Sequence, residues 1–167
     1  HNLDLAHLKN HKIRIIDQWI CMERSTSTKE EVIKNAFHPE VLNLNDLEMW
    51  TSLVSKCLFN GKFLSPKVFL FLSQQNCELL TVKDGENCIA TSLICFDGSN
   101  CAGLYMISVA PEYRGMGIGK QITTFSIERV VNKNIHLIEL QATKQAVSLY
   151  KSLGFEPCGK INLLWQF

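Results

Sequence analysis

A glycine-rich turn is the part of the sequence best suited to bind a charged ligand. It spans Arg114–Lys120 (RGMGIGK) and follows an apolar stretch that ends at Ala110. Glycines let backbone amides come close to an anion, and the first turn of a following helix adds N–H donors and a favourable dipole. Arg114 and Lys120 add positive charge at its two ends. The turn therefore predicts a binding site for phosphate groups.

Three nucleotide-binding patterns compete for this turn. A P-loop requires Ser or Thr after Gly119-Lys120, but Gln121 stands there. A dinucleotide fingerprint requires a third glycine where Lys120 or Ile122 stands. The third pattern, Arg/Gln-x-x-Gly-x-Gly/Ala, is matched at every position by the run RGMGIG.

The elements that must hold the turn follow from local patterns. Apolar spacing predicts a helix over 45–59, with Asn45 as its cap and Asn60-Gly61 as its end. Two Asp-Gly turns join three apolar runs into an antiparallel meander. The predicted strands cover 77–82, 88–96, 101–110, 135–140 and 161–167, and the later helices cover 117–132 and 143–153. The strand-helix-strand step around 117–132 favours a parallel crossover, so we expect an α/β fold with a mixed sheet.

The N-terminal part has a different character. Residues 13–16 and 19–22 are strand-like, and the polar stretch 25–31 is typical of a linker or a helix start. We therefore divide the chain into an N-terminal extension, residues 1–35, and a domain, residues 36–167. The extension is either an added strand or the end of an upstream unit. Because the chain begins without Met, a processed product or a piece of a longer protein is expected.

Two motifs together resemble a known family. The run 109–120 is similar to the acetyl-CoA pyrophosphate loop of the GNAT superfamily. The run 143–155 (TKQAVSLYKSLGF) resembles the second signature of that family, Asn-x-x-Ala-x-x-Leu-Tyr-x-x-x-Gly-Phe, with Thr143 in the place of Asn. The resemblance covers about residues 38–167. It implies a GNAT-like acyl-CoA N-acyltransferase fold, in which a mostly antiparallel sheet contains one parallel strand-helix-strand step and has flanking helices.

The resemblance also implies which residues bind acetyl-CoA. Backbone groups of Ile107 and Val109 would hydrogen-bond the pantetheine arm where two strands splay apart, and amides of the glycine-rich turn would hold the pyrophosphate. Threonine in place of Asn keeps a hydroxyl that can cap a helix but loses an amide contact, which is expected to lower affinity. The implied cofactor-binding residues are Ile107, Ser108, Val109, Arg114, Gly115, Met116, Gly117, Ile118, Gly119, Lys120, Thr143, Ala146 and Tyr150.

Tyr150 is the candidate catalytic residue. A phenol suits the general-acid role toward the CoA thiolate that leaves when an amine attacks the thioester. Taken alone, a tyrosine on an amphipathic helix is more often packed at the edge of a core, and the signature around it favours the functional interpretation. A general base is not assigned, because no carboxylate lies between Asp97 and Glu112, and Glu139 could face either side of its strand.

The predicted function is N-acetyltransfer from acetyl-CoA to a primary amine, either a small molecule or a protein amine. The alternative is an acyl-CoA-binding module without turnover, acting as a sensor or as the structural half of a tandem protein. The acceptor pocket is expected from residues 45–75 and the C-terminal strands, with Trp165 as a candidate wall.

Bulk properties set the remaining expectations. The formal net charge of the 167 residues is +1, so neither nucleic acid nor a membrane surface is an expected partner. Seven cysteines without a Cys-x-x-Cys pair favour a reducing, cytoplasmic setting, and five histidines without ligand spacing predict no metal site. A homodimer is an open alternative to a monomer.

Overall fold

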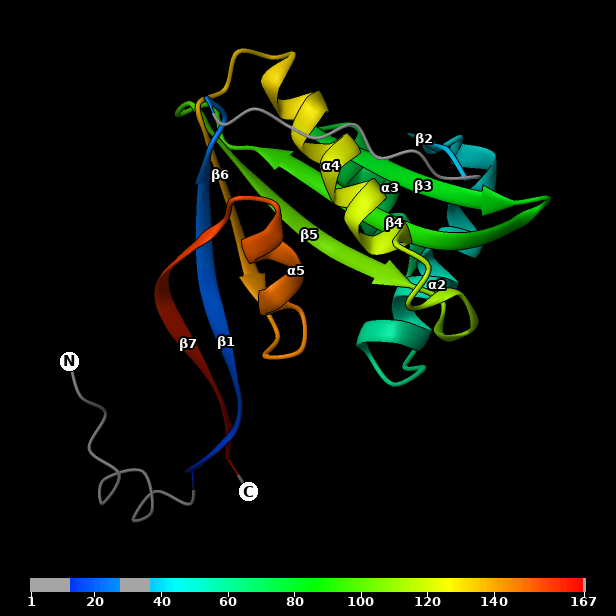
Figure 1. The fold of residues 1–167 in the computed structure, drawn as a ribbon. Helices are drawn as coiled ribbons and strands as arrows, with labels where there is room; N and C mark the ends of the chain where they lie inside the picture. Colours follow the sequence, from blue (N-terminus) through cyan, green and yellow to red (C-terminus); the bar gives the residue numbers. More distant parts are fainter. Residues whose placement is uncertain (1–12, 28–36, 167) are drawn as a thin grey trace.

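The computed structural model describes residues 13–27 and 37–166, which form one twisted sheet with helices on both faces (Figure 1). In chain order the elements are β1 (Ile13–Ser25), β2 (Pro39–Val41), the 3-10 helix η1 (Leu44–Asp46), α2 (Leu47–Leu58), α3 (Pro66–Ser73), β3 (Cys77–Asp84), β4 (Asn87–Phe96), β5 (Cys101–Val109), the 3-10 helix η2 (Pro111–Tyr113), α4 (Ile118–Val131), β6 (Leu137–Ala142), α5 (Val147–Ser152) and β7 (Glu156–Gln166). None of the described helices is long and apolar enough to cross a bilayer.

The strand order of the sheet is β2-β3-β4-β5-β6-β1-β7. β3, β4 and β5 form the predicted antiparallel meander, and glycines with positive φ stand in its two turns, Gly85 and Gly98. β5 and β6 are parallel, with α4 as the crossover between them. The expected fold class, a mostly antiparallel mixed sheet with one parallel step and flanking helices, is confirmed.

The helices close two cores, one on each face of the sheet. α4 and α5 lie in front of the sheet in the view of Figure 1, and α2 and α3 lie behind it. The front core includes Ile122, Ile127 and Phe155. The rear core is built around Trp50, which is fully buried and donates a hydrogen bond from its indole Nε1 to the carbonyl of Leu80 at 2.8 Å.

The strand-like N-terminal segment belongs to this same sheet. The two predicted pieces, 13–16 and 19–22, form the continuous 13-residue strand β1, which lies between β6 and β7 and is antiparallel to both. Of the two interpretations of this segment, the added strand is what the described residues form. Residues 1–12 and the range 28–36, which contains the predicted boundary at residue 35, lie outside the described residues.

Several element ends differ from the prediction. The helical region at 45–59 begins with η1, whose cap is Asn43 rather than Asn45: the Asn43 side chain accepts a hydrogen bond from the backbone N–H of Asn45. Its end is confirmed, since Asn60 and Gly61 both have positive φ. The nearly all-apolar run PKVFLFLS forms the helix α3, which was not predicted. β7 begins at Glu156, before the predicted start at 161.

Candidate functional site

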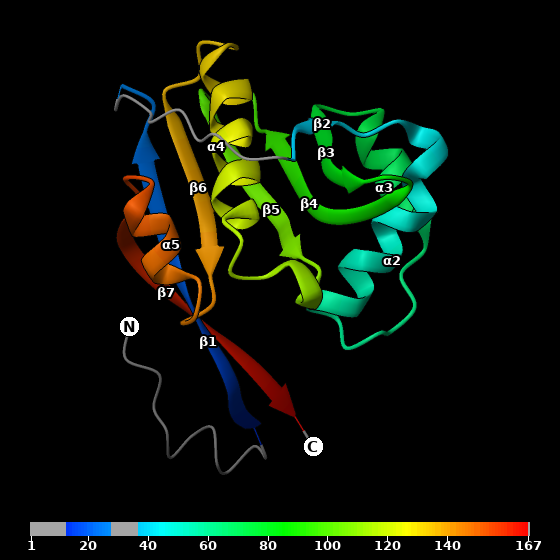
Figure 2. The same ribbon diagram turned by 45° about the vertical axis from the view of Figure 1, so that its right-hand side comes forward.

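The parallel strands β5 and β6 separate part of the way along their length. Their pairing runs from Cys101 opposite Leu137 to Leu104 opposite Leu140 and then ends, while β5 continues to Val109. The two strands diverge toward their C-terminal ends, as Figures 1 and 2 show. The edge of β5 beyond Leu104 therefore has no paired strand on that side within the described residues.

A β-bulge directs this separation. The register between β4 and β5 shifts between Thr91 and Leu93, and Met106 on the bulged strand has a φ of 50°. A bulge bends its strand and increases the local twist. The Thr91 hydroxyl donates to the carbonyl of Met106 at 2.7 Å and lies 2.5 Å from the Ser108 hydroxyl. The buried Ser108 side chain is thus engaged with β4, which fixes the bent backbone on either side of it.

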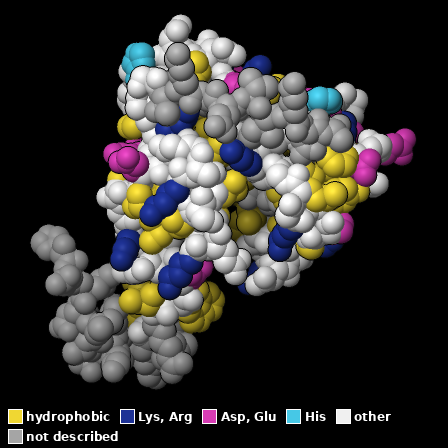
Figure 3. Space-filling view, viewed as in Figure 1, with side chains coloured by type: hydrophobic (Ala, Val, Ile, Leu, Met, Phe, Trp, Pro, Cys, Tyr) yellow, Lys and Arg dark blue, Asp and Glu magenta, His cyan; other side chains and the backbone are white. Residues whose placement is uncertain are grey.

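A cleft of about 550 Å³ occupies the space between the diverging strands and α5. Four of the predicted site residues line it, namely Ile107, Thr143, Ala146 and Tyr150. A hollow with a hydrophobic floor is visible between α5 and the start of α4, with Lys and Arg side chains around it (Figure 3). The other predicted residues, Ser108, Val109 and the glycine-rich turn 114–120, are not among the residues that line this cleft; the two motifs meet where Gly119 of α4 packs against Leu149 of α5.

Tyr150 lies on α5 and is 6% exposed. Its ring packs edge-on against Phe155, with the ring centroids 5.9 Å apart. Burial raises the pKa of the Tyr150 phenol to about 12, because the phenolate would lose its hydration inside the fold. The hydroxyl is therefore protonated at neutral pH, and Tyr150 is among the residues that line the cleft.

The glycine-rich turn forms the N-terminus of α4. Gly115 and Gly117 have φ values of 80° and 78°, a region that disfavours side chains with a Cβ, and Gly117 is the cap of the helix. The first helical hydrogen bond joins the N–H of Gln121 to the carbonyl of Gly117. Amides before that point have no carbonyl acceptor within the helix, which makes this end a natural anion site.

The remaining residues of the turn divide between core and surface. Ile118 is buried, so only its backbone is available to a ligand, whereas Met116 is 56% exposed. A Cβ on Gly119 would lie 3.5 Å from a methyl carbon of Leu149, because α4 packs closely on α5 here. Lys120 lies in the first turn of α4.

Arg114 is tied to the end of the bent strand. Its Nε donates to the carbonyl of Val109 at 3.2 Å, and the Cys57 thiol donates to the same carbonyl at 3.6 Å. The guanidinium thereby links the end of β5 to the turn that follows it.

Thr143 lines the cleft, but it is not the cap of α5. The helix begins at Val147 with Ala146 as its cap, and Thr143 contributes a turn in which its carbonyl accepts the N–H of Ala146 at 2.9 Å. The expectation that the Thr143 hydroxyl caps a helix over 143–153 is therefore wrong. The segment 143–146 is a turn, so the helix starts one turn later.

Sequence reasoning missed the residues at the far end of the cleft. Asp17 and Trp19 of β1, Leu163 of β7 and Phe59 at the end of α2 all line it. Strand-like residues were predicted on both sides of Asp17, at 13–16 and 19–22, but nothing local indicated which strands this segment would join. Trp165 is 62% exposed and is not among the residues lining the cleft.

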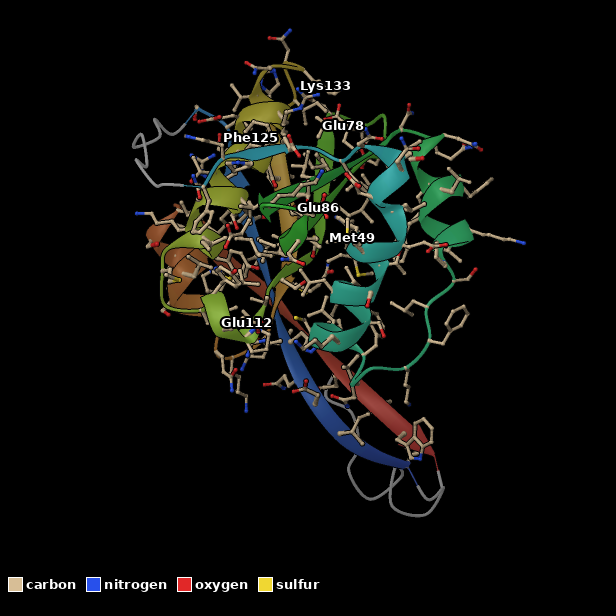
Figure 4. The ribbon with its side chains drawn as sticks, turned by 90° about the vertical axis from the view of Figure 1, so that its right-hand side faces the viewer. Met49, Glu78, Glu86, Glu112, Phe125 and Lys133 are labelled. Carbon is tan, nitrogen blue, oxygen red and sulfur yellow. The ribbon has the colours of Figure 1, made fainter. Side chains whose placement is uncertain are left out.

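The two carboxylates considered as bases lie elsewhere. Glu112 is exposed on η2 and forms a 3.9 Å ion pair with the equally exposed Lys56 of α2 (Figure 4). Glu139 is exposed on β6 and does not line the cleft. Within residues 13–27 and 37–166 there is no group of three or more His, Cys, Asp or Glu side chains that could hold a metal ion.

Comparison with known proteins gives a consistent picture. Residues 47–155 match the model of the acetyltransferase (GNAT) family. A mycothiol acetyltransferase from an Arthrobacter species is 40% identical over 55 residues, which are 31% of this chain and 17% of that protein. The chain spans only 17% to 39% of the length of the first curated relatives that it matches.

Solved structures share the fold at low sequence identity. A GCN5-related N-acetyltransferase from Kribbella flavida superposes with a TM-score of 0.68 at 14% identity, over 93% of this chain and 61% of that one. A predicted acetyltransferase from Clostridium acetobutylicum, solved with acetyl-CoA, superposes with a TM-score of 0.62 at 18% identity, over 73% of this chain and 91% of that one.

Proposed function

The chain belongs to the acetyltransferase (GNAT) family, and from this premise we propose that it transfers an acetyl group from acetyl-CoA to a primary amine. The observation that carries the proposal is the cleft between β5 and β6, which has Tyr150 of α5 on its wall, while the glycine-rich turn packs against the same helix α5 through Gly119 and Leu149. The reducing cytoplasm is the proposed setting, since all seven cysteines are free thiols.

Each part of acetyl-CoA has a matching surface in this arrangement. The pantetheine arm would lie along β5 beyond Leu104, where its amides can pair with an unpaired strand edge. The pyrophosphate would sit at the start of α4, where Gly115 and Gly117 bring amides together. Both surfaces consist of backbone groups that the fold positions in advance, which lowers the cost of ordering them around a ligand.

The chemistry then requires little from side chains. The neutral amine nitrogen attacks the thioester carbonyl carbon, the C–N bond forms, the C–S bond breaks, and CoA leaves as a thiolate while the amine proton passes to solvent. Because its pKa is about 12, the Tyr150 phenol is a weaker acid than a typical thiol, whose pKa is about 8.5. Its contribution is therefore a hydrogen bond that stabilises the thiolate, and solvent supplies the final proton.

An acyl-CoA sensor without turnover is the second candidate. It rests on Thr143, which lines the cleft where the family signature has an amide side chain. Loss of that amide would weaken acetyl-CoA binding, but an amine could still reach the thioester. We therefore favour acetyl transfer over the sensor.

The test measures binding and turnover separately. Acetyl-CoA is titrated calorimetrically, and CoA formation is followed by chromatography with a panel of primary amines, because seven protein thiols would interfere with a thiol dye. Saturable binding with amine-dependent CoA release supports transfer. Binding without release supports the sensor. If acetyl-CoA does not bind, both proposals fail.

A further inference from the structure

One negative charge stands out among the side chains that line the cleft. Asp17 is the sole charged residue in the described lining, which otherwise consists of apolar, aromatic and uncharged polar side chains. Asp17 is exposed, so solvent screens part of its charge, but a single negative charge in an otherwise uncharged lining still attracts ligands of the opposite sign and disfavours ligands of the same sign. The cleft therefore favours a cation at the end where β1 contributes to it.

Local structure fixes the position of this carboxylate. A bulge between Ile15 and Asp17 offsets β1 from β7, and the two Asp17 oxygens accept hydrogen bonds from the Gln18 N–H at 2.7 Å and the Trp19 indole Nε1 at 3.0 Å. The Gln18 side chain donates to Asn162 of β7 at 2.8 Å. Each carboxylate oxygen can accept about two hydrogen bonds, so both keep capacity for a ligand.

Two aromatic side chains accompany Asp17 in the lining of the cleft. They are Trp19 of β1, whose indole donates to Asp17, and Phe59 at the end of α2, whereas the Tyr105 ring lies over Gly103 on β5. The faces of such rings attract cations and also bury apolar groups. Asp17 is exposed and Phe59 is 36% exposed, so this part of the cleft is open to solvent while Tyr150 is buried. An acceptor can therefore enter beside Asp17 and reach toward the thioester.

From these contacts, and building on the proposed transfer reaction, we infer that Asp17 makes the acceptor site selective for cationic amines that carry no carboxylate beside the amine. The Asp17 carboxylate would hold the acceptor in its ammonium form while the aromatic side chains pack on its carbon skeleton. The ammonium would then lose its proton to solvent before the neutral nitrogen attacks the thioester. An amino acid brings its own carboxylate close to Asp17, and the like charges repel. A hydrogen bond to a charged group contributes enough to change affinity by about 10-fold to 100-fold.

The experiment uses two matched pairs of ligands that differ by one carboxylate: phenethylamine with phenylalanine, and cadaverine with lysine. Binding to the protein saturated with CoA is measured calorimetrically, so no reaction is needed, and KM and kcat are then measured with acetyl-CoA. We expect the amine of each pair to bind at least about 10-fold more tightly than the amino acid. In the same assays we expect Asp17→Asn to lose that preference mainly through KM.

Two further variants control the test. Asp17→Glu keeps the charge and is expected to keep the preference for amines. Glu86→Gln removes one negative charge from the exposed turn between β3 and β4, outside the cleft, and is expected to behave as the wild type (Figure 4). Together they separate a local effect of Asp17 from a change in net charge or in folding.

The outcomes distinguish this inference from the proposed function. Equal binding of both members of each pair, no effect of Asp17→Asn, or no binding of either amine overturns the inference. If acetyl transfer occurs but does not depend on Asp17, the inference fails and the proposed function stands. Binding of cationic amines that depends on Asp17, without any acetyl transfer, supports the inference and refutes the proposed function.

Discussion

Replacing Tyr150 by phenylalanine removes one oxygen atom and leaves the aromatic ring in place. The ring is nearly buried against Phe155, so the Tyr150→Phe variant is expected to fold. Loss of one donor aimed at developing charge typically lowers turnover by about 10²-fold to 10³-fold. We expect kcat to fall by this amount while calorimetry shows acetyl-CoA affinity close to that of the wild type.

The same variant has a signature in the free energy of unfolding at alkaline pH. Burial raises the pKa of Tyr150 from 10 to about 12, two units that correspond to about 3 kcal/mol. Because the folded-state pKa lies above the unfolded value, the corresponding stability is fully present below pH 10 and is lost as pH rises through about 12. The wild type should therefore lose up to about 3 kcal/mol relative to Tyr150→Phe over this interval.

Urea denaturation of both proteins from neutral pH to about pH 12 measures this difference, since titrations common to the two proteins cancel. Glu86→Gln, in the exposed turn between β3 and β4, is the control variant and should leave kcat unchanged. The reasoning is refuted if Tyr150→Phe retains wild-type kcat, or if its stability relative to the wild type does not change with pH.

Three other predictions concern the turn, an ion pair and a thiol pair. Gly117→Ala places a Cβ at a φ of 78°, so chemical denaturation should show a free energy of unfolding lower by about 1–2 kcal/mol. Calorimetry should also show a weaker acetyl-CoA affinity. Unchanged values would contradict the proposed role of the turn in binding the pyrophosphate. Burial acts to raise the pKa of Glu78. The hydrogen bond from Arg129 at 2.8 Å and the contact with Lys133 at 3.2 Å outweigh that effect, so the pKa of Glu78 is lowered. Glu78 and Lys133 are labelled in Figure 4. Glu78→Gln should therefore reduce stability by about 1–2 kcal/mol at neutral pH, and this difference should disappear as pH falls through the folded pKa; a loss that does not depend on pH would argue against the ion pair. The sulfur atoms of Cys77 and Cys95 lie 2.8 Å apart, so treatment with a disulfide oxidant such as oxidised glutathione should join them with loss of two hydrogen atoms, which peptide mass mapping detects; linkage of other cysteines in their place would contradict this geometry.

Local signals were sufficient for the parts of the fold that are close together in the sequence. The Asp-Gly turns predicted the β3–β4–β5 meander because each turn fixes the register of the two strands it joins. The glycine-rich turn predicted the start of α4, where Gly117 adopts the backbone conformation that the pattern requires. The local structure at the start of α4, where we propose that the pyrophosphate binds, was therefore predictable.

The part of the cleft that β1 and β7 line was not predictable from local patterns. Asp17 and Trp19 reach it because β1 pairs with β7, and the Gln18–Asn162 hydrogen bond joins residues 144 positions apart. No periodicity in a window of ten or twenty residues contains that information. The helix α3 was missed for a different reason: its run is nearly all apolar, which hides the spacing of a helical face.

The placement of β1 has a consequence for how the protein folds during synthesis. β1 leaves the ribosome before both of its neighbours, β6 and β7, and α4 and the whole meander are made in between. Until it docks, the facing edges of β6 and β7 present unpaired amides and carbonyls to any other strand that is available. Contacts of such long sequence separation form late and slow the folding rate. We therefore expect a late folding step in which one strand completes the sheet and also the part of the cleft that β1 and β7 line, with aggregation as the competing outcome.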